Sequence, residues 1–339
     1  MNITILSDGA WGTALGCVLC NNNHKVVQWG PFPEYLATIA KERVNSKFLP
    51  GVKLPDSLII EPDMEKAVKD ADIVLLATPT QYLRSVLEKF FPYFDSDKHI
   101  IVNVAKGIEQ NTLLRVSQIT ESVIGKSKYV VLSGPSHAEE VAMGKITGLV
   151  AASLNPKNSI KVRELLKVPG LMVYSSFDIV GVQICAAAKN VIAVVYGAMD
   201  AISETSNLIG DNCESLLMAA GLNEIQTLGF AMGATHAETF TSISGVGDLD
   251  VTCKSKYGRN RRFGQDLIKT DMLSKFKDID DLIANVSKIG YLPEGAIACK
   301  YVYEIGKKKD LRLPLTYVLY RILNKECSVQ QALEEVMSL

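Results

Sequence analysis

Five short segments of this 339-residue sequence place polar side chains among small or apolar residues. They are Lys106-Gly107, Ser133-Gly134-Pro135-Ser136, Lys189-Asn190, Gly247-Asp248-Leu249 and Gly258-Arg259-Asn260-Arg261-Arg262. A lysine becomes a general base once burial or a second cation lowers its pKa, and a carboxylate can hold it in position. An arginine can bind a phosphate through two N–H groups. Together beside a nucleotide, these groups are suited to the oxidation of a phosphorylated alcohol.

Lys189 is the strongest candidate for the base. It lies in the segment 186–193, which is expected to be helical and is otherwise apolar apart from Asn190. A lysine is costly to bury there unless it is paired. The alternative is a lysine whose ammonium group extends along the helix to solvent. Asp248 follows Gly247 in a Gly-rich turn and is the candidate partner, although an Asp after Gly is commonly a helix N-cap.

Lys106 and Ser136 follow two successive strand-like runs. Ligands of doubly wound sheets lie at the carboxyl ends of the strands, so Lys106 is predicted to face a cofactor crevice, with a surface loop as the alternative. Ser136 is predicted to cap the next helix, with Glu139 completing a capping box. His137 is a less favoured candidate base, because a residue beside a cap is more often a packing or surface residue.

The arginine-rich segment 258–264 resembles a nucleic-acid patch at first sight. The formal net charge of the chain is only −1, however, and Tyr257 and Phe263 are the only aromatic residues beside the arginines. A phosphate clamp or a solvated basic loop is therefore favoured over nucleic-acid binding.

A dinucleotide-binding turn is predicted at the N-terminus. Ser7-Asp8-Gly9-Ala10-Trp11-Gly12 follows the strand-like run Ile3–Leu6 and opens a helix. Two of the three fingerprint glycines are present, and Ser7 occupies the first position. No acidic or basic side chain occurs between Gln28 and Glu34, where the second strand ends. The choice between NAD and NADP is open, with NAD favoured because no cation is placed for a 2′-phosphate.

Composition places the chain among globular proteins, with 47% hydrophobic and 22% charged residues. Near-neutral charge excludes a global attraction to nucleic acid or anionic membranes. Seven scattered cysteines indicate a reducing compartment, and Cys17 and Cys20 are interpreted as helix-packing residues, with no metal site expected. No signal peptide is predicted, and apolar runs such as 191–199 are too short to span a membrane. These features predict a cytoplasmic location.

The first half of the chain alternates β-branched runs with amphipathic segments. Strands are predicted at 3–6, 25–29, 73–77, 100–104, 129–132 and 149–152, with helices such as 81–90 and 113–124 between them. This pattern predicts an α/β Rossmann-like, doubly wound parallel sheet. Long Ala/Leu/Ile/Met-rich segments follow and predict an all-α C-terminal domain. We place the dinucleotide-binding domain at 1–177 and a helical domain at 178–339, which the family resemblance described below implies is the substrate and dimerisation domain.

These motifs, in this order and over nearly the whole length, resemble the bacterial-type NAD(P)-dependent glycerol-3-phosphate dehydrogenases. Further segments carry the resemblance: Asn45 with Phe48-Leu49-Pro50-Gly51, Ile108-Glu109, Ala138-Glu139-Glu140, Gly210-Asp211-Asn212, Thr252-Cys253 and Glu294-Gly295. The chain departs from the family pattern at Ser7, Pro31, Ala220 and Gly258, and at 201–209, which is longer than the usual link.

The resemblance implies roles for individual residues. Lys189 would accept the proton of the C2 hydroxyl while hydride passes to the nicotinamide ring, and Lys106 and Asp248 would complete the catalytic group. The substrate would be bound by Lys106, Gly134, Ser136, Lys189, Asn190, Asp248, Thr252, Gly258, Arg259 and Asn260. The cofactor would be bound by Gly9, Ala10, Trp11, Gly12, Lys106, Ala138, Arg259 and Glu294. Lys106, Lys189 and Arg259 are expected to converge on one small anion.

The expected activity is the interconversion of sn-glycerol 3-phosphate and dihydroxyacetone phosphate, which in this family supplies glycerophospholipid synthesis. One alternative is a β-hydroxy acid dehydrogenase of related architecture, which would need no phosphate clamp. Another is a non-catalytic nucleotide-binding protein. By resemblance the partners are a phosphorylated small molecule and a second copy of the chain, with neither nucleic acid nor membrane insertion. Feedback regulation stays open.

Overall fold

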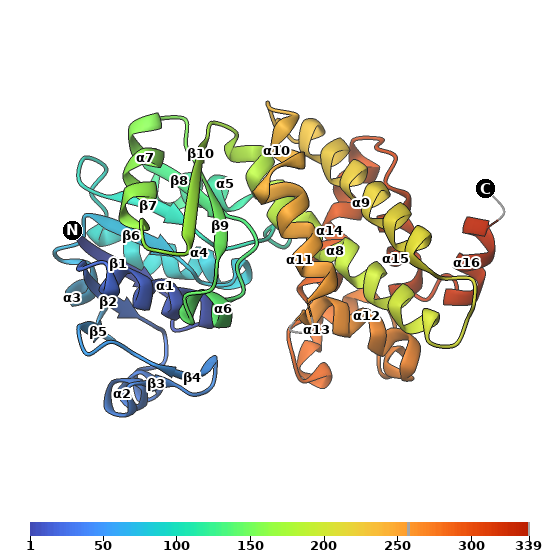
Figure 1. Ribbon diagram of the computed structural model, residues 1–339, viewed down its shortest axis with the longest axis horizontal. Coiled ribbons are helices and arrows are strands. Elements are labelled where there is room, and N and C mark those ends of the chain that lie inside the picture. Colours follow the sequence, from blue (N-terminus) through green and yellow to red (C-terminus); the bar gives the residue numbers. More distant parts are fainter. Residues whose placement is uncertain (256–257, 338–339) are drawn as a thin grey trace. The chain divides into compact units, whose positions relative to one another are not determined.

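One eight-stranded sheet organises the N-terminal half of the computed structural model, which describes residues 1–255 and 258–337 (Figure 1). The spatial order of its strands is β10-β9-β8-β7-β6-β1-β2-β5. Their bounds are Asn2–Leu6 (β1), Lys25–Trp29 (β2), Leu58–Ile60 (β5), Ile73–Leu76 (β6), Ile100–Asn103 (β7), Lys128–Ser133 (β8), Thr147–Ala152 (β9) and Leu171–Ser176 (β10). The short strands β3 (Val44–Asn45) and β4 (Leu49–Lys53) form a separate hairpin. All six predicted strands are present.

The predicted sheet was entirely parallel, and one pair corrects this prediction. β9 runs antiparallel to β8, whereas every other neighbouring pair in the sheet is parallel. The helix between them, α6 (Ala138–Ala142), has only five residues. The segment 134–146, which includes α6, therefore connects neighbouring strands at one end of the sheet instead of crossing to the opposite end.

Helices cover both faces of this sheet, as a doubly wound fold requires. Residues alternate between the two faces, so that Ile73 and Leu75 of β6 join one hydrophobic core while Val74 and Leu76 join the other. The first core includes α1 (Ala10–Asn21) and α7 (Pro156–Leu165), and the second includes α3 (Met64–Val68), α4 (Thr80–Phe90) and α5 (Val116–Ile124). The helix α2 spans Pro33–Glu42. The Rossmann-like prediction is confirmed.

Every regular element that the structure describes after Ser176 is helical. The longer helices are α8 (Ile179–Ser203), α9 (Asp211–Ala231), α11 (Asp248–Lys254), α12 (Arg259–Lys269), α14 (Glu294–Lys308), α15 (Pro314–Leu323) and α16 (Val329–Met337). Shorter helices are α10 (Glu238–Thr241) and α13 (Ile279–Ala284). The chain divides into two compact units, Met1–Gln183 and Ile184–Leu339. The all-α prediction for the C-terminal half is confirmed.

The apolar run 191–199 belongs to a much longer helix than its sequence suggested. The 25 residues of α8 are long and apolar enough to cross a membrane, with a mean hydropathy of 1.8 in the most apolar window. The prediction that this stretch is too short was therefore wrong. However, 83% of that window is buried inside the protein, as in the central helix of a folded core.

Two glycines allow α12 to lie directly against α8. A Cβ atom at Gly264 would overlap the carbonyl oxygen of Val194, and a Cβ atom at Gly197 would overlap that of Arg261. The backbones of the two helices are thus in contact, which fixes α12 relative to the segment of α8 that carries Lys189.

Replacing Gly264 with Ala is expected to destabilise the protein by about 1–3 kcal/mol, because the added methyl group must push the two helices apart. Gly210→Ala is the matched control, since no atom lies within 4 Å of a Cβ atom at that position. Urea unfolding would measure both variants. Equal unfolding free energies for the two would contradict the close helix contact.

Candidate active site

Lys189 of α8 is buried and bound by two side chains of α11. Only 6% of Lys189 is exposed, and its Nζ forms an ion pair with Asp248, of which 1% is exposed. Nζ also donates a hydrogen bond to Thr252 Oγ1 (2.8 Å), and this hydroxyl donates to the Asp248 carbonyl oxygen (2.6 Å). The carboxylate compensates for the desolvation of the ammonium group. The predicted Lys189–Asp248 pairing is therefore present, and the solvent-exposed alternative for Lys189 is excluded.

Asp248 and Thr252 are one turn apart on α11, so their side chains share a face of the helix. Gly247, not Asp248, occupies the N-cap position, and the Asp248 carboxylate is directed to Lys189. The N-cap alternative for Asp248 is excluded by this geometry.

A second polar contact joins α8, α12 and α14. Asn260 Nδ2 donates to Asn190 Oδ1 (2.9 Å), and Gly295 N donates to Asn260 Oδ1 (2.8 Å). Both asparagines are buried, at 6% and 5% exposed. Asn260 is the second residue of α12, so the contact holds the N-terminus of α12 beside Lys189-Asn190.

The three arginines after Gly258 have different environments. Arg261 pairs with Asp200 (2.8 Å), and Arg262 lies over the ring of Tyr291, 5.0 Å from its centroid. The side chains of Arg259 and Arg262 are both exposed, at 58% and 70%, and Arg259 Nη2 lies 3.7 Å from Glu294 Oε1. Of these three arginines, Arg259 is the one at the first position of α12. Tyr257, which the sequence interpretation considered, lies outside the described residues.

Lys106, Gly134 and Ser136 lie together at the carboxyl ends of the neighbouring strands β7 and β8. Lys106 Nζ donates to the Gly134 carbonyl oxygen (3.1 Å), and Ser136 Oγ donates to the same oxygen (2.9 Å). These bonds agree with the predicted position of Lys106 at the carboxyl ends of the strands, where doubly wound sheets bind their ligands.

The predicted capping box at Ser136 is wrong. The N-cap of α6 is His137, whose side chain makes no capping bond, and the helix begins at Ala138. Because the helix starts one residue later than a Ser136 cap requires, Glu139 is at its second position, and the Ser136 hydroxyl turns back to Gly134 instead.

The first turn of α1 fits the pyrophosphate of a dinucleotide. Gly9 is the N-cap of this 12-residue helix, and it has no side chain that could bind the N–H groups of the first turn. A Cβ atom at Gly12 would lie 3.0 Å from Ile5 Cγ2 and 3.2 Å from Ala77 Cβ, so glycine permits close packing of helix and sheet. N–H groups at such a helix terminus favour an anion. Ser7 is accommodated because its Oγ accepts a hydrogen bond from Gly9 N (3.0 Å).

Other predicted cofactor residues lie beside this turn. Ala10, Trp11 and Ala138 belong to one small apolar cluster. Trp11 Nε1 is buried and has no hydrogen-bond partner among the residues that the structure describes, which is consistent with a site that a polar ligand completes.

Two buried residues hold the turn, and the sequence analysis assigned this role to neither of them. Gln28 Nε2 donates to the Ser7 carbonyl oxygen (2.9 Å) and to Thr13 Oγ1 (2.8 Å). Asn45 Nδ2 donates to the Asp8 carbonyl oxygen (2.7 Å) and to the same Thr13 hydroxyl (2.9 Å). A polar residue in a buried strand, such as Gln28 in β2, is the signal that was available.

Cys17 and Cys20 are buried on α1, as predicted for packing residues. Burial raises the pKa of the Cys17 thiol to about 11. The thiol is therefore protonated near neutral pH, which makes it a poor nucleophile or metal ligand.

The predicted site residues thus form two groups, one in each unit. Lys189, Asn190, Asp248, Thr252 and Asn260 are brought together in the helical unit, with Gly258, Arg259 and Glu294 at the adjoining helix ends. The predicted convergence of Lys106 with Lys189 and Arg259 involves both units and stays a prediction.

Similarity to known proteins extends over both units. The family models for the NAD-dependent glycerol-3-phosphate dehydrogenase N-terminus and C-terminus match residues 2–159 and 178–334. A glycerol-3-phosphate dehydrogenase (NAD(P)+) of Treponema denticola is 50% identical and covers 99% of this chain and 98% of its own length. The enzyme of that name from Enterococcus faecalis is 38% identical, with coverages of 99% and 95%. A crystal structure of glycerol-3-phosphate dehydrogenase from Coxiella burnetii matches with a TM-score of 0.89 and 30% identity, covering 100% and 99% of the two chains.

Asp248→Ala is expected to lower the free energy of unfolding by about 3–5 kcal/mol, because it leaves the buried Lys189 ammonium group uncompensated. Asp250→Ala on the same helix is the matched control, since its ion pair with Lys254 is exposed and should contribute about 1 kcal/mol or less. Urea unfolding compares the two. If both cost the same, the Lys189–Asp248 pair is not the buried interaction described above.

Proposed function

The chain belongs to the NAD-dependent glycerol-3-phosphate dehydrogenase family, and we propose that it interconverts sn-glycerol 3-phosphate and dihydroxyacetone phosphate. The observation that carries this proposal is the buried ammonium group of Lys189, fixed by Asp248 and Thr252. Oxidation of an alcohol needs a group that takes the hydroxyl proton, and an amine held in a buried position can do so. When bound, the nicotinamide of NAD or NADP supplies the hydride acceptor.

Lys189 is the proposed acid and base at the C2 oxygen. During oxidation its amine takes the hydroxyl proton, and during reduction its ammonium group returns a proton to the carbonyl oxygen. Asp248 and Thr252 bind the same Nζ, so the position of the proton-transferring atom is set by α11 before substrate arrives.

The phosphate of the substrate is the proposed partner of the α12 N-terminus. The exposed guanidinium of Arg259 can make two parallel hydrogen bonds to a phosphate, and the helix terminus adds a favourable potential. Asn190 and Asn260 fix this terminus through their mutual hydrogen bond. With Thr252 and Gly258, they would line the proposed substrate pocket. From the N-terminal unit, Lys106, Gly134 and Ser136 would contact the same substrate.

The dinucleotide is the proposed ligand of the α1 turn. Gly9, Ala10, Trp11 and Gly12 would hold its pyrophosphate, with Ala138 beside them, and Lys106, Arg259 and Glu294 would border the rest of it. We propose NAD as the favoured form, because β2 is followed by Gly30-Pro31 and no basic side chain for a 2′-phosphate follows the strand.

The cellular role follows the resemblance. We propose a cytoplasmic enzyme that supplies glycerol 3-phosphate for glycerophospholipid synthesis, with residues 1–177 as the dinucleotide-binding domain. Residues 178–339 would bind the substrate and form a homodimer. The alternatives are not favoured. A β-hydroxy acid dehydrogenase has no need for the phosphate clamp at Arg259, and a non-catalytic nucleotide-binding protein has no need for a buried Lys189–Asp248 pair.

A spectrophotometric assay at 340 nm with dihydroxyacetone phosphate and each reduced cofactor tests the proposal directly. Lys189→Ala is expected to lower kcat by about 10²–10⁴-fold, the usual effect of a general acid–base group. Lys254→Ala, which removes an exposed lysine of α11, is the control and should retain the parent rate. Parent-like turnover by Lys189→Ala would show that another group transfers the proton.

A further inference from the structure

The connection that carries Lys106 has an unfavourable backbone. This segment, residues 104–115, joins β7 to α5, and two of its residues other than glycine are left-handed, with φ of 67° at Asn111 and 58° at Leu113. A branched residue such as Leu113 rarely adopts this conformation. Such a backbone persists only where surrounding contacts determine it.

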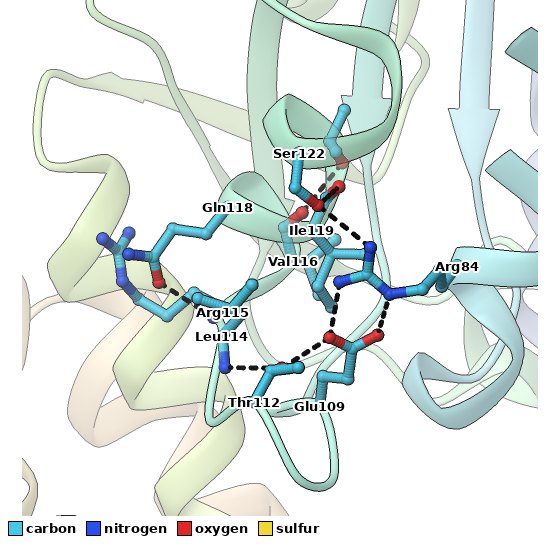
Figure 2. A network of polar contacts seen from close by, with 10 residues as sticks. Arg84, Glu109, Thr112, Leu114, Arg115, Val116, Gln118, Ile119 and Ser122 are labelled. Carbon is cyan, nitrogen blue, oxygen red and sulfur yellow. Dashed lines mark hydrogen bonds and ion pairs between the residues drawn. The ribbon is translucent and has the colours of Figure 1, made fainter. Parts of the chain in front are cut away.

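Glu109 is the centre of those contacts (Figure 2). Arg84 of α4 binds both of its carboxylate oxygens, with Nε to Oε1 at 2.8 Å and Nη2 to Oε2 at 2.7 Å. The Thr112 hydroxyl donates to Oε2 (2.5 Å), and Glu109 N donates to the Leu114 carbonyl oxygen (2.9 Å). Arg84 Nη1 also donates to Ser122 Oγ of α5 (3.1 Å). The guanidinium therefore joins α4, the connection and α5.

The Arg84–Glu109 pair differs from the exposed ion pairs of the chain. The Glu109 side chain is only 11% exposed, and its two oxygens are bound by a guanidinium in the two-bond geometry that fixes orientation as well as distance. Hydrogen bonding to Arg84 holds the pKa of Glu109 below its usual range, so the carboxylate is ionised near neutral pH.

A second contact on the same face of α4 fixes the start of the connection. Thr80 and Arg84 are one turn apart. A Cβ atom at Gly107 would lie 2.7 Å from Thr80 Oγ1, so only glycine permits this close approach. Gly107 is thus held against the first turn of α4 and Glu109 against the second, and Lys106 directly precedes Gly107.

We propose that Arg84 is a positioning residue for the reaction, which acts through Glu109 to set the place of Lys106. The inference rests on the proposed function, because it needs Lys106 to contact substrate and cofactor. Arg84 itself binds the Glu109 carboxylate and the Ser122 hydroxyl. Its role is to keep Asn111 and Leu113 in their left-handed conformations. In this form of the connection, the Lys106 ammonium group reaches the Gly134 carbonyl oxygen. Without Arg84, Asn111 and Leu113 relax and Lys106 moves.

The test compares Arg84→Met with the parent enzyme. The expected result is a loss of roughly tenfold to 10²-fold in kcat/KM for dihydroxyacetone phosphate, the scale of effect of a displacement near 1 Å. NADH should bind more weakly in an equilibrium fluorescence titration, while the melting temperature changes little. Arg84→Lys keeps the charge but not the two-bond geometry, and should fall between the parent and Arg84→Met.

Arg321→Met is the matched control. Arg321 makes a comparable two-bond contact with Glu335 in the helical unit, at 2.6 and 3.0 Å, and its removal should leave both kcat/KM and NADH affinity unchanged. If Arg84→Met does not fold, Arg84→Lys is judged by the same measurements.

A double-mutant cycle with Lys106→Met separates positioning from a structural role. Because Arg84 acts through Lys106, Arg84→Met should weaken NADH binding in the parent but add little when Lys106 is already replaced. Additive effects, or a lower melting temperature with unchanged kcat/KM and NADH affinity, would overturn the inference. Absence of turnover by the parent itself would instead reject the proposed function.

Discussion

A lysine in the middle of an apolar helix is the constraint on which the helical unit depends. The α8 helix is almost wholly buried around Lys189. An unpaired ammonium group there would lose its hydration at a cost on the order of several kcal/mol. The compensating groups, Asp248 and Thr252, belong to a helix that lies 59 and 63 residues later in the chain. Because Asp248 and Thr252 must both reach one nitrogen atom, α11 has little freedom to slide or rotate. The Lys189–Asp248–Thr252 arrangement is thus required for folding, independently of its proposed catalytic role.

In the N-terminal unit, buried polar groups also need partners, and here both the groups and their partners are neutral. The turn between β1 and α1 exposes carbonyl oxygens that would be costly to bury without partners. Gln28 and Asn45 supply their side-chain amides to the Ser7 and Asp8 carbonyl oxygens, and both meet at the Thr13 hydroxyl. The Gln28 and Asn45 side chains thus fix the backbone of the turn. The proposed pyrophosphate would therefore bind to a turn whose conformation is already set.

Sequence patterns predicted those elements whose burial is uniform. Strands β6 and β7 are buried along their whole length, and their sequences are short apolar runs that begin with β-branched residues. In contrast, β10 is an edge strand with several exposed residues, and β5 has only three residues, so neither carries a strong hydrophobic signal. The antiparallel direction of β9 was not predicted, and α6 was predicted to begin one residue too early, at a Ser136 cap. The Lys189–Asp248 pair was predictable because both residues are polar exceptions in apolar surroundings, whereas Arg84 resembles any exposed arginine of an amphipathic helix.

The arginine-rich segment shows why charge counted along a sequence is a poor guide to charge presented in space. Successive residues of a helix point in directions about 100° apart, so Arg261 and Arg262 face different sides of α12, whereas Arg259 and Arg262 are three residues apart and face the same side. Arg261 is directed to Asp200, and Arg262 lies over Tyr291 near Asp266. Arg259, the first residue of α12, keeps an exposed guanidinium where the helix terminus already favours an anion. The segment therefore has one arginine in a largely buried ion pair and two exposed arginines, of which Arg259 lies at the helix end. For a chain with almost no net charge, the proposed phosphate site relies on the local placement of Arg259 and the α12 N-terminus rather than on overall charge.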